Sequence, residues 1–162
     1  MNATESSLDA AIRTALRQVM HPNRDPAVVD TLPPNAPTDL RTVFAALAGT
    51  TIEPDDAQPI DIFDVDEMRD VRGQTGYAEA LPSAIFFASD GGDGWFYVDT
   101  DGSIGGTAGA VLWGDRCAMR RETSVRVAPD LAGFLVAAAN GKAYPNVDAP
   151  SIAHESGSIT SR

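Results

Sequence analysis

The spacing of apolar residues predicts two helices at the start of the chain. Residues 7–20 carry apolar side chains at helical intervals, directly after Ser6, whose hydroxyl is typical of a helix start. A proline-rich connector is predicted over residues 21–37. A second amphipathic helix is predicted from Thr38, and Gly49 is expected to end it in a left-handed conformation.

The middle of the chain alternates short apolar runs with glycine-rich or acidic turns, which indicates antiparallel strands. The expected strands are TTI (50–52), PIDIF (59–63), SAIFFAS (83–89), GWFYVD (94–99), AGAVLWG (108–114) and ETSVRV (122–127). Between the second and third runs, Asp64 and Glu67 have the spacing of a capping box for a small helix over residues 65–71. The loop that follows it is expected to contain Gly73 and Gly76.

A last helix is predicted over residues 129–139, with Pro129 in its first turn and Gly141 beyond its end. Helices at both ends of a strand block are typical of an α+β domain with a central antiparallel meander flanked by helices. We expect one such domain over residues 1–144 and a flexible tail over residues 145–162.

Charge narrows the classes of partner. The chain has 12 basic and 23 acidic residues, a formal net charge of −11, which disfavours binding to phosphate backbones. No apolar run approaches the roughly 20 residues that span a bilayer, and the first residues lack the pattern of an export signal. We therefore expect a cytoplasmic protein that binds neither nucleic acid nor membrane. Cys117 is the only cysteine, which excludes an intramolecular disulfide and is interpreted as a buried thiol.

Much of the negative charge lies between residues 53 and 70. Eight acidic residues fall in this run, opposed by Arg69 alone: Glu53, Asp55, Asp56, Asp61, Asp64, Asp66, Glu67 and Asp70. Such a run is commonly a solvated face. The sharper alternative is a docking surface for a basic protein, because complementary charge speeds association and selects partners.

The stretch FFASDGGDGWFYVDTDGS, residues 86–103, is the most distinctive in the sequence. It is not a phosphate-binding loop, because a strand-like run follows it rather than a helix and Tyr97 stands where a dinucleotide motif needs glycine. An EF-hand is also disfavoured, since Ile104 and Ala110 replace its glycine and its bidentate glutamate. Aspartate and glycine are the residues of tight turns, so we predict two hairpin turns and no metal site.

No catalytic constellation emerges from the sequence. The two histidines, His21 and His154, lie in flanking segments, and no histidine is placed near Cys117. Paired carboxylates remain an alternative for acid–base chemistry, without a spacing that distinguishes them. An arginine cluster is interpreted as an exposed face that pairs with acidic residues rather than an anion site: Arg116, Arg120, Arg121 and Arg126.

Aromatic residues gather in the strand block. Alternation along GWFYVD places Trp95 and Tyr97 on one face of the sheet and Phe96 on the other. One face is expected to pack on the helices. For the other face two alternatives stay open. Burial in the core is the more frequent outcome for any one aromatic, whereas partly exposed aromatics beside acidic residues would make a protein-binding surface.

These features together resemble the SUKH superfamily, which includes cell-wall-synthesis regulators of the Smi/Knr type and many bacterial immunity proteins. The similarity covers roughly residues 30–142 and is carried by LPSAIFFASDGGDGWFYVDTDG, GAVLWGD, VRVAPDLAGFLVAAANG and, upstream, IDIFDVDEMRDV. Gly91, Gly92 and Asp93 match the family's turn, and Phe134 with Leu135 match its closing helix.

The resemblance implies a bent antiparallel sheet flanked by helices and a function in protein binding, with no catalytic residue or cofactor. Our expectation is an immunity protein that neutralises a cognate toxin, such as a basic nuclease. A regulatory or scaffolding module and a carboxylate-dependent hydrolase remain alternatives. The expected contact residues are Asp61, Asp64, Asp66, Glu67, Asp70, Trp95 and Tyr97.

Overall fold

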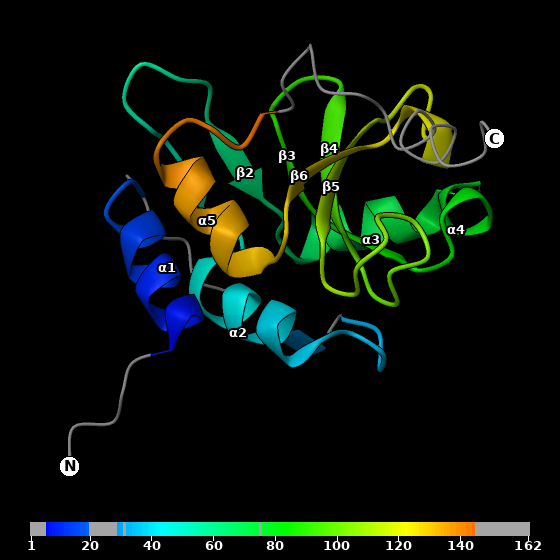
Figure 1. The fold of residues 1–162 in the computed structure, drawn as a ribbon, viewed down its shortest axis with the longest axis horizontal. Helices are drawn as coiled ribbons and strands as arrows, with labels where there is room; N and C mark the ends of the chain where they lie inside the picture. Colours follow the sequence, from blue (N-terminus) through cyan, green and yellow to red (C-terminus); the bar gives the residue numbers. More distant parts are fainter. Residues whose placement is uncertain (1–5, 20–28, 31, 75, 145–162) are drawn as a thin grey trace, which may run out of the picture.

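The computed structural model describes residues 6–19, 29–30, 32–74 and 76–144, which form an α+β arrangement around one sheet (Figure 1). The helices are α1 (Ser7–Leu16), α2 (Thr38–Leu47), α3 (Val65–Gly73), α4 (Tyr77–Ala80) and α5 (Leu131–Ala139). The strands are β1 (Thr51–Ile52), β2 (Ile60–Ile62), β3 (Ala84–Ser89), β4 (Gly94–Asp99), β5 (Val111–Asp115) and β6 (Val125–Ala128). The predicted tail over residues 145–162 lies outside the described residues.

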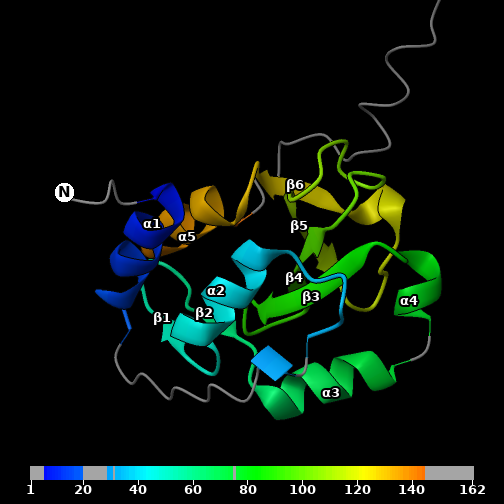
Figure 2. The ribbon, with the colours of Figure 1, turned by 90° about the horizontal axis from the view of Figure 1, so that it is seen from below.

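The six strands follow one another in the sheet in the order of the chain, and every neighbouring pair is antiparallel. The predicted meander is therefore confirmed. Helices α1, α2 and α5 gather on one side of the sheet, whereas α3 and α4 lie away from α1 and α5 (Figures 1 and 2). Register shifts in the β3–β4 and β5–β6 pairs add local twist to the sheet.

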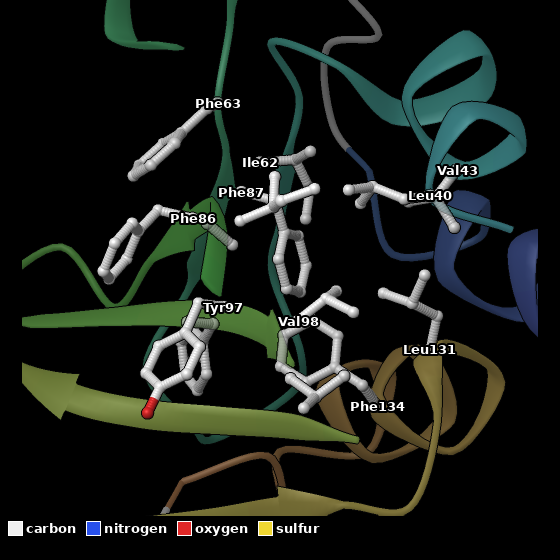
Figure 3. Close-up of a cluster of buried hydrophobic side chains, with 14 of the residues drawn as sticks. Leu40, Val43, Ile62, Phe63, Phe86, Phe87, Tyr97, Val98, Leu131 and Phe134 are labelled. Carbon is white, nitrogen blue, oxygen red and sulfur yellow. The ribbon is translucent and has the colours of Figure 1, made fainter. Parts of the chain in front are cut away.

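The first face of the sheet packs on the helices through Phe134 of α5. Its ring lies 5.3 Å from that of Phe87 and 5.0 Å from that of Phe96, between ring centroids. Leu40 and Val43 of α2 point toward the same group of side chains (Figure 3). All five residues are buried, which makes this contact the centre of the main core.

The second face is also buried, so of the two alternatives for its aromatic residues burial in the core is confirmed and partial exposure is wrong. Trp95 is 7% exposed and Tyr97 is 0% exposed. Tyr77 of α4 lies over this face, with its ring 5.2 Å from Trp95 and 5.8 Å from Phe86. Phe63, which follows β2, packs edge-on against Trp95 at 6.1 Å. A helix as short as α4 leaves no periodic signal in the sequence, which is why its cover was not predicted.

Burial of both faces of β3 explains why its sequence is apolar almost throughout. Phe86 lies against Tyr97 on the second face, and Phe87 lies against Phe134 on the helical side, as alternation along a strand requires. Phe86 pairs with Tyr97 and Ala88 pairs with Phe96, so the strand contains a bulge with Phe87 as its extra residue.

Several helix boundaries differ from the prediction. α1 ends at Leu16 rather than at residue 20, because Val19 pairs with Ile52 in an isolated bridge that needs extended backbone. Pro129 precedes the N-cap Asp130 instead of lying in the first turn of α5. Gly73 belongs to α3 rather than to a loop.

Two predicted helix ends are confirmed. The capping box of α3 is present, with Asp64 N donating to Glu67 Oε2 and Glu67 N donating to Asp64 Oδ1, each at 2.8 Å. Gly49, after α2, has φ +75°, which L-amino acids other than glycine rarely adopt.

The aromatic contact under α5 gives a first prediction. Phe134→Ala should lower the free energy of unfolding by about 3–5 kcal/mol, because it removes a fully buried ring and leaves a cavity. Val136→Ala, on the same helix but 42% exposed, is the control and should change it by no more than about 0.5 kcal/mol. Urea denaturation followed by circular dichroism measures both. Similar losses for the two variants would contradict this account of the core.

Candidate functional site

The first turn of the glycine–aspartate stretch is organised by the carboxylate of Asp90. This side chain accepts hydrogen bonds from Gly92 N at 2.8 Å, Gly94 N at 3.1 Å and the Trp113 indole at 3.0 Å. A Cβ at Gly94 would collide with the Trp113 ring and with Asp90, so this position needs glycine. The predicted hairpin between β3 and β4 is thus present, and its aspartate ties the turn to β5.

The second connection, between β4 and β5, is a longer loop than the predicted tight turn. Asp99, at the end of β4, is fully buried. It accepts hydrogen bonds from Ser83 Oγ at 2.9 Å, Ile104 N at 2.9 Å and Gly105 N at 2.7 Å. The loop therefore folds around a buried carboxylate, which is satisfied by the donors that a buried charge requires.

Neither aspartate belongs to a group shaped for a metal. Within the described ranges, no three or more His, Cys, Asp or Glu side chains are placed to hold a metal ion together. The carboxylates of Asp90 and Asp99 instead accept hydrogen bonds that hold the connections on either side of β4.

Five of the eight acidic residues of the run lie on β2, on α3 or at the N-cap between them, whereas Glu53, Asp55 and Asp56 lie in the connection between β1 and β2. We call Asp61, Asp64, Asp66, Glu67 and Asp70 the acidic face. The first two are half-buried, and the other three are exposed. Asp61 accepts a hydrogen bond of 2.6 Å from Thr51 Oγ1 on the neighbouring strand, which fixes its position in the sheet.

Glu67 lies close enough to three other carboxylates of the acidic face for their charges to act on its pKa. Partial burial raises this pKa above its ordinary value of 4.5. The hydrogen bond from the Asp64 backbone lowers it, while the negative charges of Asp64, Asp61 and Asp70 raise it further. Arg69 relieves little of this repulsion, because its 4.0 Å ion pair with Asp66 is highly exposed.

Trp95 and Tyr97 do not join the acidic face, so their expected role as exposed contact residues is wrong. Trp95 is covered by Tyr77 of α4, and Tyr97 is fully buried beside Phe86, with the two rings 5.2 Å apart. Burial raises the pKa of Tyr97 to about 12, and the nearby Ser124 hydroxyl opposes this rise without meeting hydrogen-bond geometry. In this conformation neither side chain is available to a partner.

The other candidate residues are placed as follows. Cys117 is exposed, which corrects the interpretation of a buried thiol, because it lies in the turn after β5 rather than in a strand. The four arginines are exposed, as predicted, and Arg116 forms a 4.0 Å ion pair with Asp93; for the other three, charge pairing stays a prediction. His21 and His154 lie outside the described residues.

A pocket of about 320 Å³ lies beside the acidic face, and no pattern in the sequence predicts it. We call it the α3 pocket. Its lining includes Met68 and Val71 of α3, Tyr77 of α4, Ile85 and Phe86 of β3, and Pro33 of the segment before α2. These residues come from four separate segments, so only the folded chain brings them together.

A second, more open hollow of about 610 Å³ lies along α5. Asp130, Val136 and Lys142 are among its lining residues, with Ser7 at the start of α1. Val136 is the large apolar side chain that the described part of the chain exposes most, at 42%. A single exposed valine is ordinary for a protein surface, so this hollow carries no functional argument.

Comparison of the chain with known proteins identifies no relative. No family model, no curated protein and no solved structure matches the chain. Among the described residues, no helix combines the length and the apolar character needed to cross a bilayer. The acidic face and the α3 pocket are the two surface features that bear on function.

The buried carboxylate of Asp99 gives a second prediction. Asp99→Asn should lower the free energy of unfolding by about 1–3 kcal/mol, because an amide nitrogen replaces an oxygen that accepts buried hydrogen bonds. Asp101→Asn is the matched control, since Asp101 is exposed in the same loop and the Asn Oδ1 can still accept its hydrogen bond from Ser103 N. It should change the value by no more than about 0.5 kcal/mol. Chemical denaturation that ranks the two variants equally would contradict the role given to Asp99.

Glu67 gives a third prediction, on pH. Its pKa is raised in the folded protein, so folding favours the protonated form, and this contribution to stability is lost as pH rises above about 4.5. Glu67→Gln keeps the capping box and removes the charge. The variant should therefore melt higher than the unaltered protein at pH 7, and the difference should shrink toward zero near pH 4.

Thermal unfolding followed by circular dichroism between pH 4 and pH 8 measures this difference. Glu122→Gln, at an exposed position before β6, is the control and should show no comparable trend with pH. A Glu67→Gln variant that melts lower at pH 7, or whose effect is the same at every pH, would contradict the electrostatic account of the acidic face.

Proposed function

We propose that this chain is a non-catalytic protein-binding module of the SUKH type, which neutralises a basic toxin by binding it through the acidic face. The observation that carries this proposal is the convergence of five carboxylates on β2 and α3, with little positive charge among their described neighbours. The antiparallel meander flanked by helices agrees with the architecture that the SUKH resemblance implies.

A basic partner has a physical reason to bind this face. The negative charges of Asp61, Asp64 and Asp70 all raise the pKa of Glu67, so the carboxylates repel one another in the free protein. A lysine or arginine side chain placed among them would relieve that repulsion. Long-range attraction would also speed the encounter, in a manner that salt weakens.

The hydrolase alternative finds less support in the geometry. Such an enzyme needs two carboxyl groups in a pocket with shifted pKa values. The described residues that line the α3 pocket include no carboxylate. The carboxylate oxygens of Asp90 and Asp99 accept hydrogen bonds from backbone N–H groups in the connections on either side of β4. A regulatory module would use the same acidic face, and it differs from an immunity protein in what its partner does.

A protection experiment tests the proposal and is our fourth prediction. A partner captured on the immobilised protein at about 50 mM salt and released at about 500 mM is identified, and its gene is expressed in a test host. We expect growth arrest when the partner is produced alone and restored growth when this chain is produced with it. A partner that is harmless alone would overturn the toxin-neutralising role and favour the regulatory alternative.

Charge reversal tests the surface with the same purified partner. Asp66→Lys combined with Asp70→Lys should weaken binding roughly tenfold at low salt, because both side chains are exposed and outside the capping box of α3. Glu122→Lys combined with Asp101→Lys is the matched control and should bind like the unaltered protein. Isothermal titration calorimetry measures both. Equal affinities for the two double variants would exclude the acidic face as the contact surface.

A further inference from the structure

We propose that the α3 pocket is an anchor site for one apolar or aromatic side chain of the basic partner, flanked in that partner by lysine or arginine. This inference rests on the proposed function, since the partner is the one that the acidic face attracts. It adds a second part to the binding surface. The acidic face selects a basic segment, and the pocket selects the uncharged side chain within that segment.

The lining of the pocket defines the chemistry of the group that it takes. Met68, Val71, Ile85 and Phe86 are buried side chains that form its apolar part. None of the described lining residues is charged, so a charged group entering the pocket would lose water without gaining an ion pair there. An apolar or aromatic side chain loses nothing of this kind and removes apolar surface from water.

Polar and exposed residues form the rim. Asn35 and Gln74 are exposed lining residues with side-chain amides, and Ala78 and Pro82 are exposed beside them. A buried apolar centre with a polar, solvent-exposed rim is the arrangement found around the dominant residues of protein interfaces.

The walls of the pocket are held in place before any partner binds. Arg41 Nη2 donates a 2.9 Å hydrogen bond to Pro33 O and fixes the segment before α2. Tyr77 Oη donates a 2.8 Å hydrogen bond to Arg116 O and fixes α4. The capping box fixes the start of α3. A preformed site costs less ordering free energy on binding than one that must assemble around its ligand.

The pocket and the acidic face share one helix. α3 contributes Met68 and Val71 to the pocket and contributes Asp66, Glu67 and Asp70 to the acidic face. Its nine residues rise about 1.5 Å each, so the residues that α3 gives to both features lie within roughly 14 Å along the helix axis, and Glu67 and Val71, four residues apart, are neighbours on the helix surface. A basic segment of a few residues is long enough to reach both at once.

Short peptides test this inference without the natural partner. The probes are dye-labelled, blocked peptides of the form Lys-Lys-X-Lys-Lys, with phenylalanine, leucine or alanine at X. We expect the phenylalanine and leucine peptides to bind roughly tenfold more tightly than the alanine peptide, because only their side chains fill apolar space in the pocket. Fluorescence polarisation at 20 mM and 200 mM salt measures the affinities.

A matched pair of variants on α4 locates the effect. Ala78→Phe places a ring at the rim and should remove the preference for phenylalanine over alanine at X, because Ala78 lines the pocket. Ala80→Phe makes the same change at an exposed position of the same helix outside the lining, and it should keep the preference. Both positions are exposed, so both variants should fold, which circular dichroism and the melting temperature check.

The outcomes separate this inference from the proposed function. Salt-sensitive binding with no preference among the three peptides, or a preference that survives in Ala78→Phe, overturns the anchor site and leaves the acidic face in place. No binding of any peptide at 20 mM salt counts against the acidic face as well. If free indole binds and Ala78→Phe blocks it while the peptides show no preference, the pocket is a small-molecule site and the anchor proposal is wrong.

Discussion

Strand β4 is buried along its whole length, and the rest of the structure depends on covering both of its faces. On one face, Phe134 of α5 packs against Phe96, supported by the neighbouring β3. On the other face, Tyr77 of α4 packs against Trp95. A central strand with large side chains on both sides cannot leave one face to water, because that would expose a wide apolar patch. The second face of β4 has to be covered, and this explains why α3 and α4 are inserted between β2 and β3.

The glycine–aspartate connections let this buried strand end and turn. Asp90 and Asp99 lie at the two ends of the β4 region, and each gathers backbone donors that would otherwise lack partners. Burying a carboxylate is costly unless its oxygens are satisfied, so these two residues depend on the glycines around them as much as the turns depend on the aspartates. The glycine–aspartate stretch resembles a binding loop in the sequence, but in the structure its aspartates hold the turns of the sheet.

Helix α3 has a different character on its two sides. Its buried side chains Met68 and Val71 line a pocket, while its exposed side chains include Asp66, Glu67 and Asp70. Partial burial raises the pKa of Glu67, and the negative charges of Asp64, Asp61 and Asp70 raise it further. In the proposed function, a basic partner would relieve this repulsion. The proposed interface therefore draws its selectivity from the same helix that closes the second face.

The sequence by itself determined the α+β class, the strand order and the capping box at Asp64 and Glu67, because these depend on local spacing and on turn residues. It also determined which carboxylates lie on β2 and α3, since they are neighbours in the chain. Only the tertiary structure decided that Trp95 and Tyr97 are buried. Trp95 is covered by Tyr77 of α4, a helix of four residues with no periodicity of its own, and Tyr97 packs against Phe86 of β3. The α3 pocket likewise depends on four separate segments meeting, and no local pattern of residues encodes such a meeting. Long-range packing, which sets burial and cavities, is the part that the order of residues does not reveal directly.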